Sequence, residues 1–591
     1  MTETYKQDRW ELKDLFTGFD AEKVSETLNE IEARLTEFEK HKDTLSAGIG
    51  ADAFLAILDE YDHLIRLLSR LVGYSHLRFA EDTQDQEAQM YLAKFQQKIA
   101  ESDNRSLFFK LWWKDLDEKN ANRLMDASGD YCYFLEYLRI QKPFTLSEAE
   151  EKIVNLKDVN GAHALTRLYD SITNRYVYKM VIDGEVKEMT RGELAVFARS
   201  TDPDLRAASY QEIFRVYEND LPILGQIYQS LVSDWYSENV GLRGFSCPIS
   251  VRNLGNNVPD DVVDTLLDVS QKNVKLFQEY FRLKARWLGV DKIRRYDVYA
   301  PVVQSDKRYT YQEAIDLVLT SYRRFEPEIA DLAEQIFTSK HIDSEVRKGK
   351  RSGAFCATIE PDLLPWVLTS YQGRADDVAT LAHELGHAVH SMLAADHTAL
   401  TQDASLPLAE TASTFGEMLV VDHLLSQDPD PEVRRDLLFR QMDDNYATIM
   451  RQAYFAIFER DAHKLIRKGA SINDLNDVYM KNLEDQFGDS LEINEEFKLE
   501  WSVIPHIFHT PFYVYAYAFG QLLVLSLYQQ YRKEGDSFKP RYRKILAAGG
   551  SASPAEILTE AGIDMTSAAF WQGGYDVLKG ALEELKQIPV E

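Results

Sequence analysis

The chain is poor in cysteine. Its 591 residues include only three, Cys132, Cys247 and Cys356, and these lie far apart in the sequence. An odd number of widely spaced cysteines excludes a disulfide framework and gives no cysteine-based metal site. Such sparse use of cysteine is typical of a reducing compartment. We therefore expect a cytoplasmic protein.

Long hydrophobic runs are also missing. No stretch approaches the roughly 18 uncharged apolar residues that would predict a membrane helix. The nearest, residues 514–527, is shorter and is interrupted by Gly520 and Gln521, so we interpret it as a buried core helix. The first residues, MTETYKQDRWELKDLF, lack the basic segment followed by an apolar stretch that is typical of a signal peptide. The sequence therefore predicts neither a membrane anchor nor export.

Positive charge is in deficit. The chain has 67 Lys and Arg residues against 96 Asp and Glu residues, a formal net charge of -29. Nucleic acids and anionic membrane surfaces would be repelled on average, so we expect neither as a partner. The excess of acid suits a cationic or neutral substrate, or serves solubility alone.

Helical periodicity, in contrast, is abundant. Apolar residues recur at three- and four-residue spacing in several segments, namely residues 21–40, 51–71, 87–101, 260–289 and 432–468. We interpret residues 260–289 as one long helix, and residues 432–468 as one helix or two joined helices. A chain of this length exceeds what one hydrophobic core usually supports, so we expect at least two lobes.

Strand signals are few. Residues 175–189 alternate apolar and polar side chains around Asp183 and Gly184, a residue pair that favours a hairpin turn. Residues 353–372 contain two short apolar runs separated by a turn with proline. These patterns predict a mainly α protein with a small β-sheet. We place a domain boundary after the hairpin, at residue 195.

One amphipathic helical segment, residues 376–394, carries a motif with clear chemistry: DDVATLAHELGHAVHSMLA. His383 and His387 lie four residues apart, so both imidazoles project from the same side of the helix. This spacing lets two neutral ring nitrogens reach one Zn²⁺ at about 2.0–2.1 Å. Glu384 points to a neighbouring face, where a base must lie to accept a proton from zinc-bound water. Gly386 has no side chain, which permits another element to approach closely.

A zinc site needs a third protein ligand, and Glu410 is the candidate. It lies 23 residues after His387, far enough for the chain to leave the first helix and turn back. Ser405 can cap a new helix and Pro407 fits its first turn, so we expect a second helix to present the carboxylate. Two histidines and one glutamate leave a fourth position open, which is the pattern of a catalytic zinc site.

Two further residues near the motif are left open. Glu417, two helical turns after Glu410, either supports a ligand as an additional carboxylate or belongs to the polar surface of the helix. His390, one turn after His387, either forms a hydrogen bond near the site or is a satisfied structural histidine. Neither residue is assigned as a ligand.

The motifs HELGHAVH and LAETAST resemble those of the oligoendopeptidase F group of the thimet-type zinc oligopeptidases. The resemblance extends to KRSGAFCATI, YFRLKARWLGVDKIRRYDVYAP and IPHIFHTPFYVYAYAFG, and it covers most of the chain. It implies a mainly α, two-lobed zincin-type metallopeptidase with a deep substrate channel and a small β-sheet beside the active-site helix. Residues 1–195 would be an N-terminal helical lobe that ends in the β-hairpin, and residues 196–591 the zinc peptidase domain.

The resemblance also implies the roles of individual residues. One Zn²⁺ per chain would be held by His383, His387 and Glu410, with Glu384 as the general base. The partners implied are short peptides, which bind as substrates. We also expect residues 353–359 to align the substrate backbone by strand addition.

The aromatic segment near the C-terminus is expected to contact the substrate, because in thimet-type enzymes a histidine and tyrosines there stabilise the oxyanion. We assign these roles to His506, Tyr513 and Tyr517. The two tyrosines lie one helical turn apart and can face the same way. The spacing from the histidine differs from that of thimet-type members, so His509 remains an alternative. Tyr515, on the opposite side, is interpreted as part of an aromatic core.

The predicted function is zinc-dependent hydrolysis of internal peptide bonds in short unstructured oligopeptides. One alternative is an exopeptidase of the dipeptidyl carboxypeptidase type, which needs a group to hold the terminal carboxylate; the sequence identifies none. Another is a non-catalytic peptide-binding protein with a vestigial zinc site, against which the presence of all four required residues argues. Cleavage preference, physiological substrate and oligomeric state do not follow from the sequence.

Overall fold

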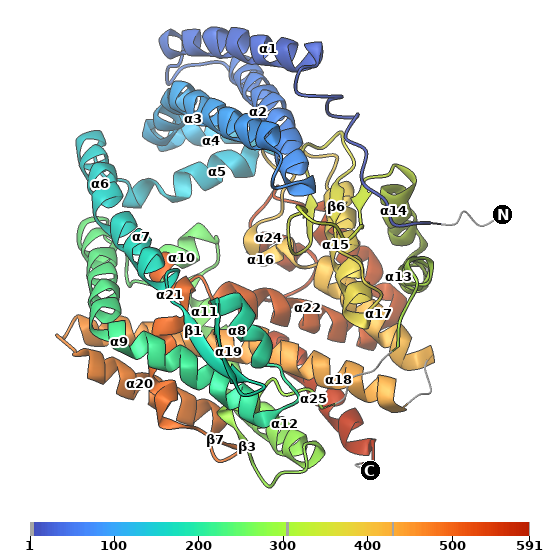
Figure 1. The fold of residues 1–591 in the computed structure, drawn as a ribbon. Coiled ribbons are helices and arrows are strands. Elements are labelled where there is room, and N and C mark those ends of the chain that lie inside the picture. Colours follow the sequence, from blue (N-terminus) through green and yellow to red (C-terminus); the bar gives the residue numbers. More distant parts are fainter. Residues whose placement is uncertain (1–4, 303–306, 428–430, 590–591) are drawn as a thin grey trace. The chain divides into compact units, whose positions relative to one another are not determined.

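The computed structural model describes residues 5–302, 307–427 and 431–589. Within these residues the chain is mostly helical (Figure 1). It also contains seven short strands. The predicted class, mainly α with a small sheet, is confirmed. No helix in the described parts of the chain is long and apolar enough to cross a membrane.

The chain divides into two compact units, each assembled from three separate segments. The first unit consists of Met1–Lys142, Asp306–Asp428 and Gln530–Asp564, and the second of Pro143–Ser305, Pro429–Gln529 and Met565–Glu591. Residue 195 lies inside the second unit. The division predicted between residues 1–195 and 196–591 therefore differs from these units and stays a prediction, as does the channel implied by the resemblance.

The first unit holds the predicted zinc motif. Its helices and strands are α1 (Glu22–Glu39), α2 (Ala51–Glu81), α3 (Gln86–Asp115), α4 (Glu118–Met125), α5 (Cys132–Ile140), α13 (Tyr311–Phe325), α14 (Pro327–Thr338), β4 (Ile342–Asp343), β5 (Phe355–Ala357), β6 (Trp366–Leu368), α15 (Ala375–Leu393), α16 (Leu406–Ala409), α17 (Ser413–Gln427), α23 (Lys539–Ala547) and α24 (Pro554–Glu560).

The second unit holds the predicted substrate-contacting aromatic segment. Its elements are α6 (Glu148–Asn160), α7 (Ala162–Thr173), β1 (Tyr178–Ile182), β2 (Glu185–Met189), α8 (Arg191–Phe197), α9 (Pro203–Trp235), α10 (Ser250–Gly255), α11 (Asp260–Lys272), α12 (Val274–Trp287), β3 (Ile293–Arg294), α18 (Pro431–Asn445), α19 (Arg451–Ile466), α20 (Ile472–Phe487), β7 (Leu491–Glu492), α21 (Pro505–His509), α25 (Ala568–Gln587) and, up to residue 529, α22 (Tyr515–Glu534).

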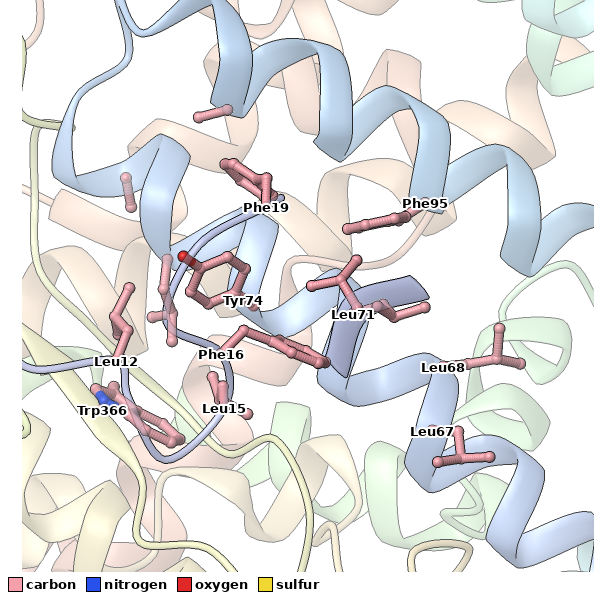
Figure 2. Packing of buried hydrophobic residues seen from close by; sticks show 14 of the residues in the cluster. Leu12, Leu15, Phe16, Phe19, Leu67, Leu68, Leu71, Tyr74, Phe95 and Trp366 are labelled. Carbon is pink, nitrogen blue, oxygen red and sulfur yellow. The ribbon is translucent and has the colours of Figure 1, made fainter. Parts of the chain in front are cut away.

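A hydrophobic core joins the N-terminal helices of the first unit to its small sheet. Phe16 and Phe19 pack edge-on against Tyr74 of α2, with ring centroids 5.4 and 5.0 Å apart. Trp366 of β6 belongs to the same buried cluster (Figure 2). Its indole N–H donates to the carbonyl oxygen of Glu11 at 3.0 Å. Burying a side chain such as Phe contributes about 1.5–3 kcal/mol, so this cluster attaches the sheet firmly to the helices.

The small sheet has the strand order β4-β6-β5. Strand β4 runs parallel to β6, with Ile342 opposite Val367, and β5 runs antiparallel to β6, with Cys356 opposite the same residue. Among the described residues, β5 is therefore an edge strand. Helix α15 packs against both β5 and β6, which confirms the small sheet expected beside the motif helix.

The predicted hairpin is present in the second unit. Strands β1 and β2 pair antiparallel, and Ile182 lies opposite Glu185 across a two-residue turn. Both turn residues adopt positive φ, 56° at Asp183 and 83° at Gly184. Glycine and aspartate tolerate this left-handed conformation better than most residues, which explains why the pair marked the turn in the sequence.

The long helix predicted for residues 260–289 is wrong, because the chain breaks there into α11 and α12. Asn273 lies between the two helices with φ -100° and ψ 8°. Its side-chain amide donates to the carbonyl oxygen of Val269 at 2.9 Å. Such a local side-chain bond competes with the helical backbone ladder.

Two other helix predictions agree with the structure. Residues 432–468 form α18 and α19, joined by one π-helical turn at Tyr446–Met450. Residues 514–527 lie almost entirely in α22, whose middle is buried from Ala518 to Tyr528 except at Gln521. This is the buried core helix that the sequence indicated.

Candidate metal centre and active site

Helix α15 carries the HELGH motif and begins with a stable N-terminus. One carboxylate oxygen of Asp377, in its first turn, accepts hydrogen bonds from the backbone N–H groups of Gln372 and Arg374 at 3.0 and 2.8 Å. Acidic side chains in this position also interact favourably with the helix dipole. Near the motif, the buried hydroxyl of Tyr322 from α13 donates to the carbonyl oxygen of Ala382. These contacts fix the helix on which the candidate ligands lie.

Three donor atoms meet at one point in the first unit. The Nε2 atoms of His383 and His387 lie 3.2 Å apart. One carboxylate oxygen of Glu410 lies 3.3 Å from the first and 3.4 Å from the second. Tetrahedral bonds of 2.0–2.1 Å place neighbouring donors about 3.3 Å apart, so the triangle has the size that Zn²⁺ requires. The three donor atoms therefore already lie at the separations that a bound Zn²⁺ needs.

Two further side chains orient this group. Nδ1 of His383 is hydrogen-bonded to the carboxylate of Glu417 on α17. Of the two alternatives for Glu417, a carboxylate that supports a ligand therefore fits better than a residue of the polar helix surface. A carboxylate on Nδ1 holds the ring in the tautomer that leaves Nε2 free for a metal. The hydroxyl of Ser413 donates to Glu410 Oε2 at 2.7 Å. Sequence reasoning missed Ser413, although serine hydroxyls commonly bond to groups three residues earlier in the chain.

The ionisable side chains around the three donor atoms shift one another's pKa values. Burial opposes protonation of His383, but the carboxylates of Glu410 and Glu417 outweigh it and raise the pKa of the ring to about 10. Burial acts against ionisation of Glu410, yet His383, His387 and Ser413 together hold the pKa of its carboxyl far below the ordinary range. Burial raises the pKa of Glu384, which the two histidines only partly offset. A carboxyl group with a raised pKa is well suited to accept and return a proton.

The sequence suggested that a second helix presents Glu410, but in the structure this residue lies outside any helix. Helix α16 has only four residues, and Glu410 follows it with φ -86° and ψ 3°, before α17 begins. Pro407 is in the first turn, as expected, but the hydroxyl of Ser405 makes no capping bond. A short turn, Thr411 and Ala412, separates Glu410 from α17, and this turn lies against α15 at Gly386.

Gly386 is the point at which α15 and this turn touch. A Cβ atom at Gly386 would lie 2.6 Å from both the carbonyl oxygen of Ala412 and the Cα atom of Ser413. Because these are backbone atoms, they can yield only by moving the turn that presents Glu410. The close approach expected at this glycine is therefore confirmed.

We expect the substitution Gly386→Ala to destabilise the fold by about 1–3 kcal/mol, the usual cost of overpacking, and to weaken metal binding. Thermal unfolding and zinc titration of the purified protein measure both effects. Gly580→Ala is the matched control, because Gly580 is also helical and has no atom within 4 Å of its added Cβ. It should slightly stabilise the protein. Equal behaviour of the two variants would contradict this account of Gly386.

A cavity of about 430 Å³ adjoins the three donor atoms. Glu384 lines it together with His383, His387 and Glu410, and edge strand β5 contributes Phe355 and Cys356. The strand edge and the donor group thus share one cavity within the first unit. This arrangement supports the expectation that residues 353–359 align an extended peptide by strand addition.

His390 fits the alternative of a hydrogen bond near the site, because its ring bonds to the backbone of Ala409, the residue directly before Glu410. Its ring is buried and lines the same cavity, yet Nε2 has no hydrogen-bond partner among the described residues. Burial, reinforced by the charge of His387, lowers the pKa of His390 to about 4. The ring is therefore neutral near pH 7, and it is not the satisfied structural histidine of the simpler alternative.

The aromatic segment of the second unit forms a cluster of three rings. The ring centroids of His506 and Tyr513 lie 6.4 Å apart, those of His506 and Tyr517 6.0 Å, and those of the two tyrosines 5.4 Å. His509, the alternative histidine, instead contacts Asp170 at 2.8 Å. The structure therefore places His506, the histidine that the sequence favoured, beside the two tyrosines.

Tyr515 is buried, as expected for a core residue. Its hydroxyl accepts a hydrogen bond from the side-chain amide of Asn256 at 2.9 Å. Tyr517, in contrast, is exposed. This difference agrees with the prediction that the two residues lie on opposite sides of the helix.

Comparison with known families decides the class of this protein. The model described as Peptidase family M3 matches residues 196–577. The chain belongs to peptidase family M3. A second model, described as Oligopeptidase F, matches residues 112–178. The chain is therefore a peptidase with peptides as substrates, in a family whose members are generally metal-dependent.

Relatives of this M3 peptidase align over most of its length. It is 27% identical to oligopeptidase PepF of Bacillus subtilis (strain 168), over 99% of this chain and 88% of that protein. It is 28% identical to group B oligopeptidase PepB of Streptococcus agalactiae, over 91% of this chain and 90% of the relative. The resemblance to the oligoendopeptidase F group that its motifs indicated is thereby confirmed.

Solved structures share the fold. A crystal structure from Chlamydophila abortus matches with a TM-score of 0.89 at 25% identity, covering 100% of this chain and 99% of the other. Oligoendopeptidase F from Enterococcus faecium matches with a TM-score of 0.71 at 24% identity, over 96% and 98% of the two chains. The second likeness concerns the fold alone.

Proposed function

We propose that this M3 peptidase is a zinc-dependent endopeptidase that hydrolyses internal bonds of short unstructured peptides. The observation that carries the proposal is the triangle of donor atoms from His383, His387 and Glu410, with sides of 3.2–3.4 Å. Two imidazoles and one carboxylate form a donor set that suits Zn²⁺ and leaves one position open, as catalysis requires.

The residues around the donor set have complementary roles in this proposal. When bound, Zn²⁺ lowers the pKa of water and polarises a carbonyl group. Glu384 accepts the proton of the attacking water and returns it to the departing amine. Glu417 keeps the ring of His383 oriented, and Ser413 does the same for the carboxylate of Glu410.

Stabilisation of the oxyanion is assigned to the aromatic cluster, as the resemblance implies. The proposal gives Tyr513 and Tyr517 the role of hydroxyl donors and His506 that of a substrate contact. Its support is the clustering of the three rings and the exposure of Tyr517, 38% of whose surface is accessible. Hydroxyls that donate only to a developing oxyanion act in the transition state.

The exopeptidase and the vestigial site are weaker explanations. An exopeptidase of the dipeptidyl carboxypeptidase type needs a cationic group beside the cleavage site, yet the described residues that line the cavity in the first unit include no lysine or arginine. A vestigial site would not need the additional hydrogen bond that Glu417 makes to His383.

The decisive experiment is digestion of a short peptide with a blocked C-terminus, followed by mass spectrometry. We expect cleavage at an internal bond, loss of activity with a chelator, and recovery when Zn²⁺ is returned. The matched substrate is a tightly folded domain that carries the same cleavage sequence and should stay intact. Release of C-terminal dipeptides from the unblocked peptide alone would favour the exopeptidase, and comparable rates on the folded domain would contradict the restriction to short peptides.

A further inference from the structure

The short loop between α21 and α22 contains an unusual backbone conformation. Phe512 has φ 59°, in the left-handed region that a bulky residue rarely adopts. Its side chain is 1% exposed, so the residue is held there by its surroundings. Residues in such conformations cost about 1–3 kcal/mol and persist only where neighbouring contacts compensate. Tyr513 follows directly in the sequence.

A buried glutamate makes the compensating contact. One carboxylate oxygen of Glu459, on α19, accepts a hydrogen bond from the backbone N–H of Phe512 at 2.8 Å. The side chain of Glu459 is fully buried, and its second oxygen has no hydrogen-bond partner among the described residues. An ionisable group is expensive to bury. A hydrophobic residue would fill this space at a lower cost in free energy. The function of Glu459 here is therefore to accept the hydrogen bond from Phe512.

The surroundings of Glu459 anchor the same loop from other elements. His463, one turn further along α19, packs its ring against that of Phe512 with centroids 4.6 Å apart. Arg252 of α10 donates from Nε to the carbonyl oxygen of Pro511 at 3.4 Å. The loop is therefore held at Pro511 and at Phe512 itself.

We propose that Glu459 is a positioning residue for the reaction: by holding Phe512 in its left-handed conformation, it directs Tyr513 and Tyr517 toward the orientation in which they act. This inference rests on the proposed role of the two tyrosines as donors to the oxyanion. The physical reason is that a change of φ at Phe512 rotates the chain that follows it. Displacement of about 1 Å at reacting groups costs on the order of 10²-fold in rate.

The protonation of Glu459 suggests the right control. Burial raises the pKa of its carboxyl to about 8, although the N–H of Phe512 and the charge of Arg252 act in the opposite direction. The group is therefore mostly a neutral acid near pH 7 that acts as an acceptor. Glutamine has the same length and a carbonyl oxygen at the same place, so Glu459→Gln preserves the hydrogen bond.

The experiment compares three substitutions at this position by steady-state kinetics on a short peptide. Glu459→Leu removes the acceptor and Glu459→Asp withdraws it by one methylene; both should lower kcat by about 10- to 100-fold with little change in KM. Glu459→Gln should keep kcat near the unsubstituted value. A rate loss in the glutamine variant as large as in the aspartate variant would overturn the proposal, because the carboxyl group rather than its position would then matter. The aspartate variant decides the question even if the leucine variant does not fold.

A second arm separates positioning from simple destabilisation. Tyr513→Phe and Tyr517→Phe should each lower kcat by about 10²–10³-fold, the usual effect of losing one such donor. In a chain that carries both substitutions, Glu459→Asp should change kcat by less than about twofold, because the groups it positions are already gone. An equal loss in both backgrounds would mean that Glu459 has only a structural role.

The two proposals can fail separately. Normal kcat in both tyrosine variants would contradict the oxyanion role and the positioning role that rests on it, but not the roles of Glu384 and the three metal ligands. Slow tyrosine variants combined with a fully active Glu459→Asp variant would contradict the positioning role alone.

Discussion

Replacement of Glu384 by glutamine is expected to lower kcat by about 10²–10⁴-fold or more, the range that a positioned general base contributes, while zinc content stays near one per chain. Glu384 lines the cavity together with both histidines, but it contributes none of the three donor atoms of the candidate metal site. Glutamine has the same shape and cannot accept the proton. Steady-state kinetics together with metal analysis of the same preparation measure the two quantities.

A matched control lies on the same helix. Asp376, in the first turn of α15, is exposed and lies about two helical turns before His383. The variant Asp376→Asn removes one negative charge from the same element and should retain most of the activity. Loss of metal from Glu384→Gln, or a nearly normal rate, would show that the residue is not the base.

Removal of Glu410 should have the largest effect on metal binding. Glu410→Ala leaves two histidines, and we expect it to be isolated without stoichiometric zinc. Glu417→Ala should keep the three donor atoms and weaken zinc binding by about 10–100-fold, because only the orientation of His383 is lost. Zinc titration against a competing chelator measures both variants under identical conditions.

The comparison distinguishes the two carboxylates directly. Glu417 contacts Nδ1 of His383, whereas Glu410 lies 3.3 and 3.4 Å from the two Nε2 atoms. Greater zinc loss in Glu417→Ala than in Glu410→Ala would mean that the ligand was chosen wrongly. Retention of full zinc affinity in Glu410→Ala would contradict the triangle of donors itself.

Several features of the fold could be predicted because they are local. The four-residue spacing of His383 and His387 places both rings on one side of a helix, whatever that helix packs against. The pair Asp183 and Gly184 favours a hairpin turn through its own backbone preferences. Periodicity likewise indicated the mainly α class. It failed at Asn273, where one side chain bonds back to the preceding turn and ends α11.

The sequence by itself determined the class of the protein and the candidate motif, because periodicity and residue spacing act within a few turns of one element. Only the tertiary structure decided which residues from distant segments meet. It brought Glu417 to His383, 34 residues earlier, and paired His509 with Asp170. It also placed the backbone N–H of Phe512 on Glu459. Such contacts depend on how helices pack over one another, and no local preference encodes that arrangement.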